Sequence, residues 1–141
     1  TSIRELMRDA SPPNYLSLHV YLPESDDLDN ALAALREEIT SRYKIATTVG
    51  YGPRYLHSTG ELHKGGPPNG IYIQLVLSDG TDLPVPGRPY GFRLLAQAQA
   101  HGDFQALNKC GRRIVQLYVT GDPISSVNQL YQEVVELNGS S

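Results

Sequence analysis

Strand-like and helix-like segments alternate along this chain of 141 residues, and this alternation restricts its fold more than any other feature. Short runs of β-branched, aromatic and aliphatic residues alternate with segments whose apolar residues recur at helical spacing. Such alternation is typical of α/β proteins. We therefore predict a three-layer α/β fold, with helices flanking a mostly parallel sheet of about four or five strands. The expected strands are 15–22, 45–49, 71–77 and 113–119.

Short patterns mark the ends of the expected helices. Ser25-Asp26-Asp27 predicts an N-cap before a helix at 28–43, and Asp122-Pro123 predicts the start of the last helix. Between them, we expect a helix at 90–100 that is interrupted at Gly102-Asp103 and then extended by one turn. Gly111 is a suitable stop for that turn.

The chain is divided into three expected parts. Residues 1–14 are expected to be a lead-in or an interdomain linker, because Ser11-Pro12-Pro13-Asn14 stops a helix. Residues 15–138 form the domain and 139–141 form a tail. The length suits one hydrophobic core, but four strands are few for an α/β sheet. We therefore expect this domain to belong to a longer protein.

Charge and cysteine content exclude several classes of function. The net charge of −3 argues against a nucleic-acid binder held by bulk charge. No apolar run is long enough to span a bilayer. The single cysteine, Cys110, cannot form an intrachain disulfide or build a structural zinc site alone. We expect a cytoplasmic protein without a metal site.

The highest density of potentially reactive side chains lies at 50–68, directly after the second expected strand. Ligands of open α/β sheets bind beyond the carboxyl ends of strands, so this position favours a site. His57 is the strongest candidate, because a histidine transfers protons near neutral pH. Ser58 and Glu61 match the spacing of a capping box, which would place His57 just before a short helix. A structural histidine bonded to loop carbonyls is the alternative.

The other polar residues of this segment have supporting roles in our interpretation. Arg54 and Lys64 either hold a phosphate or lie on the surface. His63 is too far from His57 for a helical metal pair, and no third ligand stands nearby. A hydrolase using Ser58 and His57 is a weaker interpretation, because the G-x-S-x-G pattern is absent.

Two runs of this sequence resemble one enzyme family. The run from Gly50 to Pro67, and the later run from Ala98 to Leu107 followed by Gly111-Arg112-Arg113, are similar to the C-terminal domain of glucose-6-phosphate isomerase. The closest match is the isomerase half of bacterial bifunctional transaldolase/glucose-6-phosphate isomerase proteins. The resemblance extends from about Tyr15 to Val119.

The resemblance implies a sugar-isomerase (SIS) domain that acts in glycolysis and gluconeogenesis. Such enzymes interconvert glucose 6-phosphate and fructose 6-phosphate without a cofactor, and they are homodimers. It identifies His57 as the histidine that opens the sugar ring, with Arg54, Ser58, His63 and Lys64 as candidate substrate-binding residues. The implied partners are the sugar phosphate, upstream domains of the same chain and a second subunit. A non-catalytic sugar-phosphate-binding or dimerisation module is the alternative.

The sequence departs from the family at two points. The glutamate base and the phosphate loop of the family are expected upstream of this chain, and Glu61 is better explained as a helix cap. The family's lysine in the last helix has no counterpart in residues 122–130. Lys64 or Arg54 is a candidate to replace it.

Overall fold

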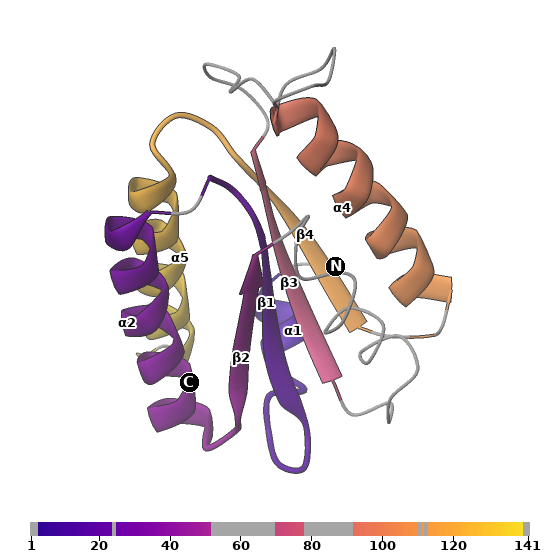
Figure 1. Cartoon of the computed structure of the whole chain (residues 1–141). Helices are drawn as coiled ribbons and strands as arrows, with labels where there is room; N and C mark the ends of the chain where they lie inside the picture. The colour runs from indigo at the N-terminus through magenta and orange to yellow at the C-terminus, as the bar shows by residue number, and fades with distance from the viewer. Residues whose placement is uncertain are drawn as a thin grey trace.

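The computed structural model of this chain describes residues 3–23, 25–51, 70–77, 92–109, 111 and 113–139. Helices and strands alternate through these ranges in the order that the sequence predicts (Figure 1). The elements are α1 (Ile3–Met7), β1 (Tyr15–Tyr21), α2 (Asp26–Tyr43), β2 (Thr47–Tyr51), β3 (Gly70–Leu77), α4 (Phe92–Lys109), β4 (Arg113–Val119) and α5 (Pro123–Gly139).

The four described strands form one parallel sheet in the order β2-β1-β3-β4. The register places Ser17 of β1 beside Thr48 of β2 and Tyr72 of β3, and it places His19 beside Gly50 and Gln74. The predicted α/β class, with helices flanking a parallel sheet, is therefore confirmed.

Helices cover both faces of the sheet and make three layers (Figure 1). α2 and α5 pack side by side on one face, and α4 lies on the other. Strand β1 is buried on both faces, because Leu16, Leu18 and Val20 alternate with buried side chains that point to the α4 side. The larger core cluster lies between the sheet and the pair α2 and α5.

The ends of α2 follow from local chemistry. The hydroxyl of Ser25 accepts a hydrogen bond of 3.1 Å from the backbone N–H of Leu28, so Ser25 is the predicted N-cap. Lys44 ends the helix in the left-handed conformation, with φ of 57°. Strand β2 begins two residues later than predicted. Ile45 is buried in the core, but pairing with β1 along the register begins at Thr47.

The predicted interruption of α4 is wrong, because one helix runs without a break from Phe92 to Lys109. Gly102 is exposed and leaves open space around it, while Asp103 turns inward and bonds to Tyr21. The hydrogen bond from buried Tyr21 thus stabilises the helical turn at Gly102-Asp103, where the sequence pattern predicted a break. The predicted stop at Gly111 is confirmed by its φ of +76° and by its N–H, which donates to the carbonyl of Asn108.

The first segment of the chain contributes to the core. Ile3, Leu6, Met7 and Ala10 are buried in the same cluster as the apolar side chains of α2 and α5. Arg113 at the start of β4 lies 3.4 Å from a carboxylate oxygen of Asp9. Residues 3–10 therefore pack as part of the domain. Within the described ranges, no helix is both long enough and apolar enough to cross a membrane.

Candidate functional site

The carboxyl edge of the sheet is where this topology favours a binding site. The chain leaves β1 towards α2 on one face, whereas the helix that follows β3 lies on the opposite face. Because β1 and β3 are neighbours in the sheet, their carboxyl ends form a topological switch point. Ligands of open α/β sheets bind in the crevice outside such a point.

The residues that the sequence singles out lie outside the described part of the chain. Arg54, His57, Ser58, His63 and Lys64 all belong to residues 52–69. The structure describes the residue from which this segment departs, Tyr51, which is the last residue of β2. Its hydroxyl donates to a carboxylate oxygen of Asp29 in the first turn of α2. The segment that carries His57 therefore leaves the sheet at the carboxyl edge, from a point tied to α2.

The amino end of α2 at this edge is unfavourable for a phosphate. Helix N-termini attract anions through free N–H groups and the helix dipole. Here the first turn carries Asp26, Asp27 and Asp29, and the side chain of Ser25 already accepts from one N–H group. Three carboxylates repel a further negative charge. A phosphate group therefore finds no complementary site among the described residues at the start of α2.

A layer of polar side chains lies on the sheet face beneath α4. The amide of Gln74 donates to the carbonyl of Ala100 (3.1 Å) and accepts from the amide of Gln116 (2.9 Å). Gln74 is 0% exposed, so both bonds are made away from water. On α4, the amide of Gln97 donates to the carbonyl of Leu77, at the end of β3 (2.8 Å). These bonds position α4 against the strand that borders the switch point.

His19 belongs to the same layer and is 1% exposed. Its ring packs against Tyr72 with 5.4 Å between the ring centroids, and the hydroxyl of Tyr72 lies 3.0 Å from that of Tyr15. Beside them, the hydroxyl of Thr48 donates to that of Ser17 (2.8 Å). His19 is therefore a core residue of its strand.

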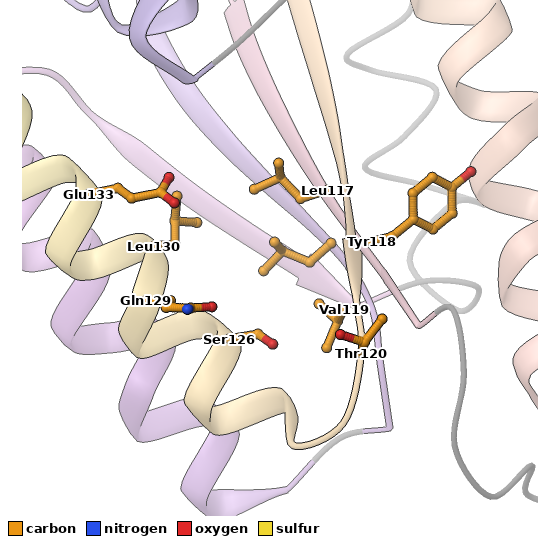
Figure 2. Close-up of a pocket in the computed structure, with 9 residues that line it drawn as sticks. Leu117, Tyr118, Val119, Thr120, Ser126, Gln129, Leu130 and Glu133 are labelled. Carbon is orange, nitrogen blue, oxygen red and sulfur yellow. The ribbon is translucent and has the colours of Figure 1, made fainter.

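A pocket of about 220 Å³ opens between β4 and α5 at the carboxyl edge (Figure 2). Its sheet side is mainly aliphatic, and its helix side carries Ser126, Gln129 and Glu133. Its described lining consists of Leu75, Leu117, Tyr118, Val119, Thr120, Ser126, Gln129, Leu130 and Glu133. This lining contains one carboxylate and no basic side chain, so the pocket does not suit a phosphate. The recurrence of polar residues at 126, 129 and 133, on one side of α5, is a sequence signal for the helix side of this pocket only.

Among the described residues, no three His, Cys, Asp or Glu side chains gather in a way that would hold a metal ion.

Tyr43, at the end of α2, is a group whose pKa is clearly shifted. Its pKa is raised by burial, and the charge of Arg42 partly opposes this effect. Tyr43 ends α2 at the opposite edge of the sheet from the switch point, so its shift does not mark a catalytic group there.

Comparison with solved structures supports the fold. No family model matches the chain, and no curated protein sequence matches it. A crystal structure of a hypothetical protein from Thermus thermophilus is similar, with a TM-score of 0.74 and 17% sequence identity. The match covers 96% of this chain and 37% of that one, so the chain spans little more than a third of the length of this structure. A de novo designed Rossmann fold protein matches with a TM-score of 0.46 and 10% identity, over 85% of this chain and 95% of the design.

Proposed function

We propose that this chain is the C-terminal, SIS-like domain of an aldose–ketose isomerase that interconverts glucose 6-phosphate and fructose 6-phosphate. The observation that carries the proposal is the end of β2. Tyr51 lies at the carboxyl edge of a parallel sheet, and the segment that resembles the isomerases continues directly from it. A catalytic segment is expected at this edge in an open α/β sheet.

In this proposal His57 moves a proton at the ring oxygen and so opens the sugar ring. A histidine suits this role because it is present in both protonation states near neutral pH. A glutamate from another part of the longer protein then carries a proton between the first two carbons, and the bound intermediate is an enediol. The reaction is a proton transfer within the substrate, so it consumes no redox equivalent.

Two places among the described residues are unsuitable for holding the phosphate of the substrate. The start of α2 is acidic, and the described lining of the pocket beside α5 has no basic side chain. In this proposal the cations that this chain contributes are Arg54 and Lys64, with Ser58 and His63 as hydrogen-bonding neighbours. A guanidinium and an ammonium at these positions would neutralise the phosphate charge.

A non-catalytic sugar-phosphate-binding or dimerisation module is the second candidate. The composition of α5 favours it, because this helix contains neither lysine nor arginine where typical isomerases supply a lysine. Under either proposal we expect a cytoplasmic protein that forms homodimers in its full-length state.

The test is an isomerase assay on a full-length protein that contains this domain. Conversion of fructose 6-phosphate is measured for the parent protein and for the variants Arg54→Gln and Lys64→Gln. We expect measurable turnover in the parent and a rise of at least about tenfold in KM in one of the variants, because a phosphate contact is lost. A parent without turnover that still binds the sugar phosphate would favour the non-catalytic module.

A further inference from the structure

The pocket between β4 and α5 has an aliphatic floor. Leu75 and Leu117 are register partners in neighbouring strands, and Val119 lies two residues further along β4, on the same face. Leu75, Val119 and Leu130 are each at most 3% exposed, so the floor is part of the core. The volume of about 220 Å³ is smaller than the roughly 300–1,000 Å³ of sites for drug-sized ligands, and it therefore suits a small molecule.

The polar wall of this pocket comes from one side of α5. Ser126, Gln129 and Glu133 lie at positions i, i+3 and i+7 of the helix, and this spacing places them on the same side (Figure 2). Thr120, directly after β4, adds a hydroxyl to the lining. Hydroxyl and amide oxygens accept hydrogen bonds, and an ionised carboxylate only accepts. The wall therefore offers several acceptors to a group that is rich in donors.

Glu133 gives this wall a negative charge. Helix α5 contains neither lysine nor arginine. Arg113 is on β4 but lies at the other end of the strand, where it pairs with Asp9 at 3.4 Å. Among the described residues, no ion pair compensates the carboxylate of Glu133. The described lining thus combines one anion, neutral acceptors and an aliphatic surface, which together complement a cation with a short hydrocarbon body.

We propose that this pocket binds a small aliphatic amine in its ammonium form. The ammonium donates to the carboxylate of Glu133 and to the neighbouring oxygens of Ser126 and Gln129, while the hydrocarbon chain lies on the aliphatic floor. A quaternary ammonium is a poorer ligand, because it has no N–H donor and binds best against aromatic faces. The aromatic ring of the described lining, that of Tyr118, points away from α5 (Figure 2).

NMR spectra of the backbone amides of the 141-residue chain test the proposal, with n-butylammonium chloride as the probe. We expect a dissociation constant on the order of 1–10 mM for so small a ligand, with the largest shift changes at Thr120, Ser126, Gln129 and Glu133. From ethylammonium to n-butylammonium, the constant should fall about two- to fourfold per added methylene, because each methylene is buried on the floor. Butanol has the same chain without the charge and should bind at least about fivefold more weakly.

Three variants locate the binding groups. Glu133→Gln should raise the dissociation constant of n-butylammonium at least about fivefold, because the carboxylate is lost. Glu136→Gln is the matched control, since Glu136 is an exposed carboxylate of the same helix outside the described lining. It should change the constant less than about twofold at physiological ionic strength. Ser126→Leu keeps the charge but fills the pocket, so it should abolish the shift changes. Far-UV circular dichroism checks that each variant retains the fold.

Several results would overturn the proposal. Equal losses in Glu133→Gln and Glu136→Gln, or a constant that does not change with chain length, would mean that the general negative charge of the surface holds the amine. The absence of shift changes at the pocket with about 100 mM probe would exclude the site. N-acetyl-lysine methylamide carries the same ammonium on a peptide unit. If it binds at least about tenfold more tightly than n-butylammonium, the pocket accepts a lysine side chain of another protein instead of a free amine. None of these measurements depends on isomerase activity.

Discussion

The hydroxyl of Tyr21 donates a hydrogen bond of 2.6 Å to Oδ2 of Asp103 and thereby joins the last residue of β1 to the middle of α4. Both residues are buried, with 0% and 6% of their surface exposed. Gln97 makes the corresponding contact at β3, through the carbonyl of Leu77. Polar bonds from α4 therefore reach both strands that border the switch point, and they fix the helix relative to the crevice between those strands.

Replacing Tyr21 by phenylalanine is expected to destabilise the domain. The change keeps the ring but removes the donor to a buried carboxylate, and this loss costs about 1–3 kcal/mol. Urea unfolding followed by circular dichroism measures the effect. Tyr131→Phe is the control, because the hydroxyl of Tyr131 lies 3.5 Å from Glu38 in a partly exposed position. Equal losses of unfolding free energy in the two variants would show that the hydrogen bond to Asp103 stabilises the domain no more than the surface contact of Tyr131 does.

Two glycines are expected to respond to alanine in opposite directions. A Cβ at Gly70 would lie 2.4 Å from the hydroxyl oxygen of Tyr72 and 2.8 Å from that of Tyr15, both packed side chains. Gly70→Ala should therefore cost about 1–3 kcal/mol in unfolding free energy. A Cβ at Gly102 meets nothing within 4 Å, and this residue is inside α4. Gly102→Ala should stabilise by about 0.5–1 kcal/mol.

Thermal unfolding of both glycine variants beside the parent chain distinguishes these outcomes. A stabilising Gly70→Ala would mean that the close approach of the two tyrosines is not maintained in solution. A destabilising Gly102→Ala would mean that this helical turn depends on the backbone freedom of glycine.

The elements of the fold were largely readable from the sequence because their signals are local. Ser25 and Asp122 mark the starts of two helices by their own hydrogen bonds, and Arg113–Val119 reads as a strand by composition. The continuity of α4 was not readable. It depends on a contact between Tyr21 and Asp103, which lie 82 positions apart. The exposure of Tyr118 was not readable either, because it depends on the place of β4 as an outer strand of the described sheet.

The candidate site was less accessible to sequence reasoning. The density of reactive side chains singles out the segment that contains His57, which follows Tyr51 at the end of β2 and lies outside the described residues, so this choice stays a prediction. The pocket beside α5 was missed. It forms between residues that are adjacent only after β4 and α5 pack together, such as Leu117 and Glu133. Polar spacing along α5 gives no information about the strand that faces it.

The 141-residue chain alone is expected to bind fructose 6-phosphate weakly, because the proposal places the glutamate base and the phosphate loop elsewhere. Isothermal titration should give a dissociation constant above about 1 mM, which corresponds to less than about 4 kcal/mol of binding free energy. No isomerase turnover is expected from the same sample. A micromolar constant without turnover would favour the binding module, and normal turnover would show that all catalytic groups lie within this chain.

The central claim is that His57 opens the sugar ring, and a comparison of two substrates tests it most directly. In a full-length protein containing this domain, kcat/KM is measured for the parent and for His57→Ala. One substrate is cyclic glucose 6-phosphate, and the other is an open-chain analogue without the ring-forming hydroxyl. His101→Ala is the control, because His101 is an exposed histidine of α4.

Loss of a positioned acid/base group lowers a rate by about 10²–10⁴-fold. The account predicts a loss of that size for His57→Ala with the cyclic substrate and less than about a tenfold loss with the open-chain analogue, because the analogue needs no ring opening. His101→Ala should leave both values unchanged. Equal losses with the two substrates in His57→Ala would contradict the account and would assign His57 a structural role.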